Sequence, residues 1–456
     1  MTRMFRSIHG INISRSRTAS GSRSNITHSW SETNMHDNTN KLLVPTFDKV
    51  VVADQLRDGY WLEAPDIDQD GKPDLFGYGL SLGEIYWYEN ESWTRHLAVD
   101  GIHMPVGGDY ADVNGNGYPD IIVCYELYGP GGTLYDANPT GGKIDWIENP
   151  GPKLSSGARW IRHYVGRTTG MHRLRAGHFT RDDRLEIAGL PIVPKGNIHS
   201  VLPVVLFAAP EDVGSAPEWV MSTIDDSFFR LVHGAEKKRG LIPGSNRDSL
   251  MLASDEGVTW LYYDEHAERW QKVLIGEGER TQFELTGFRG SGDVDVGRIG
   301  SDPFAYVAAV EPFHGNTVAV YVKDSIGESP EKTTWKRIIL DVFGDTNENG
   351  EGPGHQIVCA DFDGDGEDEF LVALRGPWPW QGVFYYKAVD IANGVFSRWR
   401  VSDESVARIA VADFNGDGRL DFATIAYSVP KYFVAKQARI AVHRNTFAPV
   451  KPGLRS

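Results

Sequence analysis

The chain has 456 residues, among them 13 Trp, 18 Tyr, 20 Phe and 50 Gly, a composition typical of many short strands joined by tight turns. Its formal net charge of −16 at pH 7 argues against a nucleic-acid-binding protein, because such proteins need a basic surface. It contains no run of about 18 apolar residues, so we expect no membrane-spanning helix.

The N-terminal segment, residues 1–42, differs in composition from the rest of the chain. Its first 30 residues hold five Arg, many Ser and no acidic residue, but they lack the apolar core of a secretory signal. Two interpretations stay open, a disordered leader and an organelle transit peptide. We therefore expect the ordered domain over residues 43–447 and a short tail over residues 448–456. A cytoplasmic location is expected, with a mitochondrial or secreted form left open.

Acidic segments of nine residues recur along the chain between apolar runs, at residues 66–74, 112–120, 178–186, 361–369 and 413–421. All but the third have oxygen-bearing side chains at positions 1, 3, 5 and 9 and Gly at position 6, the pattern that Ca²⁺ requires. An EF-hand would continue into a helix, whereas these segments continue into short strand-like runs, so we expect a structural Ca²⁺ at a strand–loop–strand corner. The alternative is that Asp and Asn simply form ordinary turns. The predicted calcium ligands are Asp66, Asp68, Asp70, Asp74, Asp112, Asn114, Asn116, Asp120, Asp361, Asp363, Asp365, Glu369, Asp413, Asn415, Asp417 and Asp421.

The spacing of these segments predicts the fold. Two weaker segments, residues 242–250 and 287–302, bring their number to seven, and intervals of about 45 to 70 residues match one four-stranded blade each. Runs such as residues 85–90 and 258–264 alternate apolar and polar side chains, as strands of packed sheets do. We therefore predict an all-β fold, a seven-bladed β-propeller with Ca²⁺-binding DxDxDG loops. Six or eight blades stay open because two of the segments are weak.

Histidines, unlike the acidic segments, occur in only some of the repeats. His172 and His355 each lie six residues before an acidic segment, and His178 replaces the first Asp of another. The inner strands of a propeller converge on a central channel, where imidazoles from several blades could hold Zn²⁺ with one position open for catalysis. The alternative is that each is an ordinary polar residue at the end of a strand. Histidines near corresponding places in other repeats are His103, His233 and His314.

Several stretches resemble the propeller region of the fungal aldos-2-ulose dehydratase (1,5-anhydro-D-fructose dehydratase) family: residues 58–64, 77–80, 170–180, 313–318 and 355–369. The acidic repeats resemble the FG-GAP, or VCBS, repeats of adhesion propellers. That enzyme family removes water from 2-keto sugars with a zinc ion held by the propeller. The resemblance therefore implies a carbon–oxygen lyase in which His172 and His233 match the metal-binding histidines, with His314 and His355 close by.

Two departures from the family bear on this expectation. The larger fungal enzymes continue into a cupin-like region that is linked with a later isomerisation, and this chain ends where that region would begin. The family carries a histidine in the second repeat where this chain has Asp109. Three outcomes stay open: the chain performs only the dehydration, uses a different acid–base group, or has lost activity.

Dehydration of a 2-keto sugar, such as 1,5-anhydro-D-fructose or an aldos-2-ulose, requires a polarised ketone, loss of a proton from C3 and loss of hydroxide from C4. A catalytic Zn²⁺ would polarise the ketone, and a histidine would transfer the proton. We expect His172, His233 and, as a weaker third, His178 to bind zinc. His314 or His355 would be the base, and Asp109 the acid or an orienting carboxylate. The expected sugar contacts are Tyr60, Trp61, Arg173 and Asn316, although the two aromatic residues would equally suit packing within a blade.

Two other functions stay open. One is a non-catalytic, carbohydrate- or protein-binding calcium propeller, which needs no inner histidine cluster. The other is a polysaccharide lyase, which also performs a β-elimination but needs a long groove and basic residues. We expect a small-molecule sugar as the binding partner, no nucleic acid and no membrane, and leave open a homodimer.

Overall fold

The computed structural model describes residues 43–449, apart from residues 134, 135, 243, 283, 284, 328 and 431. The predicted leader, residues 1–42, and residues 450–456 of the predicted tail lie outside the described residues. No helix in the described part is long and apolar enough to cross a membrane.

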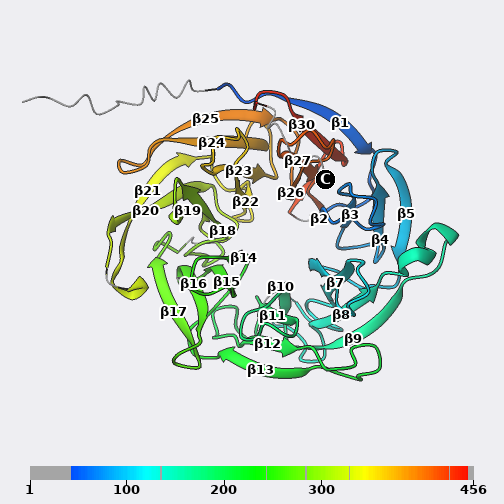
Figure 1. Ribbon diagram of the computed structural model, residues 1–456. Coiled ribbons are helices and arrows are strands. Elements are labelled where there is room, and N and C mark those ends of the chain that lie inside the picture. The colour runs from blue at the N-terminus through cyan, green and yellow to red at the C-terminus, as the bar shows by residue number, and fades with distance from the viewer. Residues whose placement is uncertain are drawn as a thin grey trace, which may run out of the picture. The chain divides into compact units, whose positions relative to one another are not determined.

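Seven four-stranded antiparallel sheets surround a central axis as the blades of a propeller (Figure 1). In blades 1 to 6 the strands follow chain order from the axis outward. Blade 1 consists of β2 (Trp61–Glu63), β3 (Leu75–Tyr78), β4 (Ile85–Glu89) and β5 (Thr94–Val99). Blade 2 consists of β6 (Gly107–Ala111), β7 (Asp120–Tyr125), β8 (Lys143–Glu148) and β9 (Ile161–Arg167). Blade 3 consists of β10 (Met171–Gly177), β11 (Glu186–Pro191), β12 (Val204–Ala208) and β13 (Val220–Asp225).

The next three blades repeat this arrangement. Blade 4 consists of β14 (Gly234–Arg239), β15 (Asp248–Ser254), β16 (Gly257–Asp264) and β17 (Arg269–Gly276). Blade 5 consists of β18 (Asp293–Ile299), β19 (Asp302–Glu311), β20 (Thr317–Ser325) and β21 (Thr334–Val342). Blade 6 consists of β22 (Gly354–Ala360), β23 (Glu369–Leu374), β24 (Gly382–Asp390) and β25 (Val395–Ser402). Short elements between strands are η1 (Gly151–Ser156), η2 (Pro330–Lys332) and the hairpin of β28 (Ser428–Val429) with β29 (Phe433–Val434).

Blade 7 joins the two ends of the domain. From the axis outward it contains β26 (Arg408–Ala412), β27 (Asp421–Ile425), β30 (Ile440–Asn445) and finally β1 (Phe47–Ala53). The first strand of the chain pairs antiparallel with the last, with Phe47 opposite Asn445. Hydrogen bonds between the N-terminal and C-terminal parts therefore close the ring.

The burial of a strand follows its position in the blade. The second strand of blade 2, β7, is buried along its whole length, whereas the outermost strand of blade 5, β21, consists of exposed and half-buried residues. The second strand of a blade packs against neighbouring blades on both faces, so it is largely apolar, while the outermost strand has one face in water. The predicted all-β, seven-bladed propeller is confirmed.

The acidic loops join the first strand of a blade to the second, and their ninth residue links neighbouring blades. The carboxylate of Asp74 accepts hydrogen bonds from the backbone N–H groups of Ile67, at 2.9 Å, and Asn90, at 2.8 Å. The Asn90 side chain then donates to the carbonyl of Phe414 in blade 7, at 2.9 Å. Equivalent asparagine bonds run from Asn149 to Ile67 and from Asn445 to Phe362. The structure therefore gives the ninth residue a role in blade packing that the calcium pattern does not predict.

In blade 6 the ammonium group of a lysine side chain lies within the acidic loop, residues 361–369. The Nζ atom of Lys387, on β24, lies 2.6 to 2.9 Å from the carboxylates of Asp363, Asp365 and Glu369. A largely buried ammonium group supplies the positive charge that Ca²⁺ was predicted to supply there. In blade 7, Arg419 pairs with the predicted calcium ligand Asp417 at 2.7 Å. Asp361, Asp363 and Asp365 still offer carboxylate oxygens within 4.8 Å of one another, so calcium in the four loops stays a prediction.

Candidate active site

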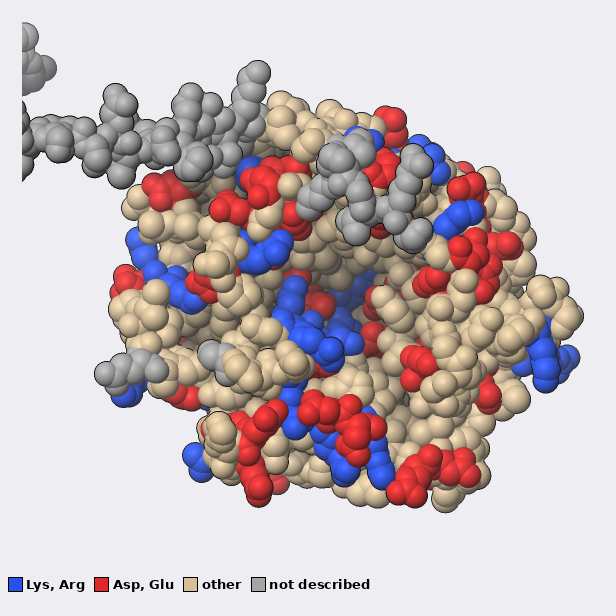
Figure 2. Space-filling model, viewed as in Figure 1, with Lys and Arg blue, Asp and Glu red and all other residues tan. Residues whose placement is uncertain are grey.

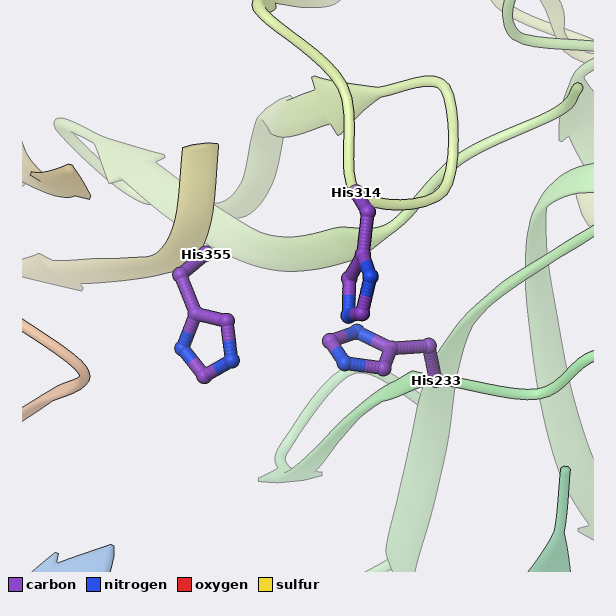
Figure 3. Close-up of side chains that lie close together, drawn as sticks. All are labelled: His233, His314 and His355. Atoms are coloured by element: carbon purple, nitrogen blue, oxygen red, sulfur yellow. The ribbon is translucent and has the colours of Figure 1, made fainter. Parts of the chain in front are cut away.

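Four imidazoles from four blades meet at the end of the channel opposite the acidic loops. His172 lies at the start of β10, His233 directly before β14, His314 in the turn between β19 and β20, and His355 at the start of β22. The ring centroid of His233 lies 5.0 Å from that of His172, 4.9 Å from that of His314 and 5.6 Å from that of His355. Three of them, His233, His314 and His355, each offer a ring nitrogen within 4.8 Å of the others (Figure 3).

Backbone carbonyls fix two of these rings. The Nδ1 atom of His233 lies 2.6 Å from the carbonyl oxygen of Gly292, and that of His355 lies 2.6 Å from the carbonyl oxygen of Ala407. A carbonyl only accepts hydrogen bonds, so Nδ1 carries the proton and Nε2 keeps its lone pair. The buried Nε2 of His355 has no hydrogen-bond partner among the described residues. This arrangement is typical of histidines whose second nitrogen binds a metal.

A carboxylate fixes the third ring. The Nδ1 atom of His314 lies 2.6 Å from Oε2 of Glu351, which also accepts a hydrogen bond from Nη2 of Arg375 at 2.6 Å. Burial opposes ionisation of Glu351, but His314 and Arg375 outweigh it and lower its pKa to about 2. His314 also has a left-handed backbone conformation, with φ of 49°, which is uncommon for a bulky residue and often found at functional sites. Sequence patterns gave no signal for Glu351 or Arg375, because neither belongs to a repeat.

Arg173 contacts the fourth imidazole. Its Nη1 atom lies 3.0 Å from Nε2 of His172, and its Nη2 atom lies 3.1 Å from the hydroxyl of Tyr60 and 3.4 Å from Nε2 of His233. Burial lowers the pKa of His172 and of His233 well below the ordinary value, and the charge of Arg173 lowers both further. The imidazoles of His172 and His233 are therefore neutral at pH 7, and in this structure their Nε2 lone pairs face the donor groups of Arg173.

A small cavity borders the cluster. Its volume is about 50 Å³, and its lining is mostly aromatic and aliphatic. Hydroxyl groups come from Tyr60, Tyr128, Tyr427 and Tyr432, alongside His172, His233 and His314. A cavity of this size holds a few water molecules.

Two predicted sugar contacts have other roles. Trp61 is fully buried, and the guanidinium groups of Arg173 and Arg408 lie 4.9 and 4.2 Å from its ring. It therefore packs within the hub, by which we mean the innermost strands and the residues around the central channel. The side-chain amide of Asn316 donates to the carbonyl of Gly344 and does not line the cavity. Tyr60 and Arg173 do lie at the cluster.

Two residues that we predicted at the active site, His178 and Asp109, lie away from the four imidazoles. His178 follows the last residue of β10, roughly 20 Å along the strand from His172, and its Nδ1 faces the carbonyl of Arg184 at 3.1 Å. Asp109 lies on β6 and accepts a hydrogen bond from the backbone of Ala176 at 2.8 Å. The predictions for His178 and Asp109 therefore differ from the structure, because the length of an inner strand separates the two ends of the channel. His103 is exposed.

Asp109 belongs to a network of charged residues on the inner strands. Arg175 pairs with Glu236 at 2.8 Å, and Lys238 pairs with Asp295 at 2.6 Å. Figure 2 shows Lys and Arg side chains gathered in the central hollow of the viewed face. Burial is the main cause that raises the pKa of Glu63, within this network, to about 8. The hub thus has a neutral imidazole end and a charged interior.

Comparison with known proteins agrees with the sequence and the fold. Residues 141–324 match the family described as "Aldos-2-ulose dehydratase, beta-propeller domain", and residues 66–123 match the FG-GAP-like repeat. Over 433 residues the chain is 37% identical to an aldos-2-ulose dehydratase from Phanerodontia chrysosporium. The predicted resemblance to the propeller region of aldos-2-ulose dehydratase is confirmed.

The extent of the similarity to aldos-2-ulose dehydratase is limited. The match covers 88% of this chain but 46% of the relative, so the chain spans about half of that protein's length. The region matched to the dehydratase propeller family contains His172, His233 and His314, whereas His355 lies beyond it.

Among solved structures, the WD40 repeats of RRP9 match with a TM-score of 0.51 at 10% identity, over 88% of this chain and 98% of theirs. U3-55K matches with a TM-score of 0.50 at 9% identity, over 87% of this chain and 98% of its own. Both structures show similarity of fold alone.

Proposed function

We propose that the protein is a hydro-lyase that removes water from a 2-keto sugar, such as 1,5-anhydro-D-fructose or an aldos-2-ulose, at the histidine cluster. The observation that carries this proposal is the convergence of four neutral imidazoles from four blades beside a small cavity. The identity to aldos-2-ulose dehydratase supports the reaction class.

The cluster fits a zinc ion. His233, His314 and His355 would hold it through Nε2, since all three have Nδ1 against a carbonyl or a carboxylate. Nε2 of His355 has no partner among the described residues, whereas Arg173 would have to move away from Nε2 of His233. This ligand set keeps His233 from the sequence-based prediction and replaces His172 and His178 by His314 and His355. When bound, zinc would polarise the ketone and stabilise the negative charge that develops on its oxygen.

His172 is then the imidazole that is left for proton transfer. Burial and Arg173 keep it neutral, as a base must be before it accepts a proton. Its Nε2 would take the proton from C3 once Arg173 moves off that atom, which leaves an enolate with a C2–C3 double bond. As the C2 carbonyl forms again, the C3–C4 double bond forms, the C4–O bond breaks and the proton passes to the leaving oxygen, which departs as water. Because Arg173 donates to Nε2, neutral His172 carries its proton on Nδ1, and this N–H, which has no hydrogen-bond partner among the described residues, would donate to a sugar hydroxyl.

Single substitutions in the cluster separate these roles. We expect His172→Gln to reduce formation of the absorbing enone product by about 10² to 10⁴-fold while zinc binding is retained. We expect His355→Gln to lose both zinc and activity. Active His172→Gln protein would contradict the assignment of the base, and active, zinc-free His355→Gln protein would contradict the metal site. Thermal unfolding of both variants controls for loss of the fold.

A structural Ca²⁺ is also proposed, in the first acidic loop. Asp66, Asp68 and Asp70 each offer a carboxylate oxygen within 4.8 Å of the others. The nearby Lys72 is exposed and 3.7 Å from Asp70, unlike the largely buried Lys387 of blade 6. Calcium titration of the wild-type protein, followed by thermal unfolding, tests this proposal.

A further inference from the structure

A second pocket, far larger than the histidine cavity, lies between blades 4 and 5. It has a volume of about 420 Å³, within the range of small-molecule sites, and shares no lining residue with the histidine cavity. Strands β16 and β17 contribute one wall, and strands β19, β20 and β21 the other. The hydroxyl of Tyr262 in blade 4 donates to Glu331 of η2 at 2.9 Å, a hydrogen bond that joins the two blades near the pocket.

Three aromatic rings form the apolar part of this interblade pocket. The ring of Phe304 lies 5.2 Å from that of Trp260 and 5.0 Å from that of Trp335. Trp260 and Phe304 are buried, whereas Trp335 is partly exposed and presents ring surface to the pocket. The buried Nε1 atom of Trp335 has no hydrogen-bond partner among the described residues.

An ion pair forms the polar part of the pocket. Nζ of Lys323 lies 2.6 Å from Oδ2 of Asp302, and 5.7 and 5.8 Å from the ring centroids of Phe304 and Trp335. Oδ1 of Asp302 accepts the backbone N–H of Phe304 at 3.0 Å. The ammonium keeps donors for a ligand, and the carboxylate oxygens keep lone pairs. The charges of Lys323 and Asp302 cancel, so this pair offers no net charge to attract an ionic ligand, and the pocket suits a neutral one.

We propose that this interblade pocket binds a pyranose ring of a neutral oligosaccharide, as a carbohydrate site separate from the histidine cluster. A pyranose has an apolar C–H face that packs on an indole ring, and hydroxyl groups at its edge that both donate and accept hydrogen bonds. Trp335 offers the ring, and the pair of Asp302 and Lys323 offers the acceptor and the donors. The site would hold the protein on a neutral saccharide chain, and it does not depend on the dehydratase activity.

Isothermal titration of the full chain with maltohexaose, cellohexaose and laminarihexaose tests this site. We expect saturable binding of at least one of them with a Kd of about 1 mM or below. Trp335→Ala should weaken that binding at least about tenfold, and Asp302→Asn should weaken it to a smaller extent. Trp378→Ala, which removes an exposed tryptophan of blade 6, should leave it unchanged and is the matched control.

Other outcomes overturn the proposal. Absence of binding for all three sugars at about 10 mM, well above the expected Kd, would do so. Equal binding by the wild-type protein and a folded Trp335→Ala variant would also overturn it, with Trp335→Phe as a second variant that keeps a ring. Binding that disappears in His355→Gln but persists in Trp335→Ala would place the oligosaccharide at the histidine cluster instead.

Discussion

At the scale of single residues, the arrangement of the hub depends on which nitrogen of each imidazole is hydrogen-bonded. Glu351 holds Nδ1 of His314, and Arg375 holds Glu351 in turn. The hydroxyl of Tyr427 accepts a hydrogen bond from Arg375 at 3.1 Å, so the chain of contacts reaches the cavity wall. Glu351 and Arg375, which do not line the cavity, thus fix the orientation of the His314 ring.

Glu351→Gln should weaken zinc binding by about 10 to 100-fold, the usual effect of removing an outer partner of a metal-bound histidine. The fold should persist, because the amide keeps the shape of the side chain. Competition with a chromophoric chelator measures the affinity. Glu348→Gln, at an exposed position of the same loop, is the matched control, and an equal affinity in both variants would show that Glu351 does not orient the ligand.

The neutral histidines also predict a pH dependence. Burial, reinforced by Arg375 and Arg408, lowers the pKa of His355 well below 6.5, so below pH 6.5 the unfolded chain binds a proton that the folded metal-free protein does not. The free energy of unfolding should therefore fall with decreasing pH by up to about 1.4 kcal/mol per pH unit for this residue. Urea unfolding between pH 5 and pH 7 should show a smaller slope for His355→Gln than for wild type, and equal slopes would contradict a neutral, buried His355.

At the scale of elements, the acidic loops connect blades as well as turning the chain. In each of three blades an asparagine after the third blade strand reaches the loop of the preceding blade, as Asn149 reaches Ile67 at 2.9 Å. Its backbone is held by the ninth loop residue, here Asp120 at 2.8 Å. The repeat pattern therefore encodes contacts between blades as well as turns within them.

Asn149→Ala should destabilise the fold by about 2 to 4 kcal/mol, because it leaves buried carbonyls of Ile67 and Pro119 and the N–H of Gly151 without their partner. Chemical denaturation gives the free energy. The exposed Asn393, replaced by Ala, should cost far less. Similar losses in the two variants would argue against an interblade role for Asn149.

Lys387→Met should destabilise blade 6 by about 3 to 5 kcal/mol, since it leaves three carboxylates without their buried counter-ion. Millimolar Ca²⁺ should then raise the melting temperature of the variant more than that of wild type, because the loop regains the charge pattern of a calcium site. Lys72→Met, at an exposed lysine of the first loop, is the control. A variant that responds to Ca²⁺ no more than wild type would contradict the replacement of Ca²⁺ by Lys387.

At the scale of the whole molecule, the repeat spacing predicted seven blades because every blade carries its turn at the same place. The closure by β1 was not predicted, since the pairing of Phe47 with Asn445 is encoded by no local pattern. The offset of His172 and His355 within their repeats placed both correctly at one end of the channel. The same counting misplaced His178, because a strand residue and a loop residue lie at opposite ends of an inner strand. Lys387 was missed because it approaches its loop from a different strand.

The central claim is that imidazoles of separate blades form one zinc-dependent site at the hub. The most direct measurement is an anomalous difference map at the zinc edge, collected from crystals of protein with measured activity on 1,5-anhydro-D-fructose. The account predicts a single strong peak bounded by His233, His314 and His355. Active protein with no peak there, or with zinc only at the acidic loops, would contradict it.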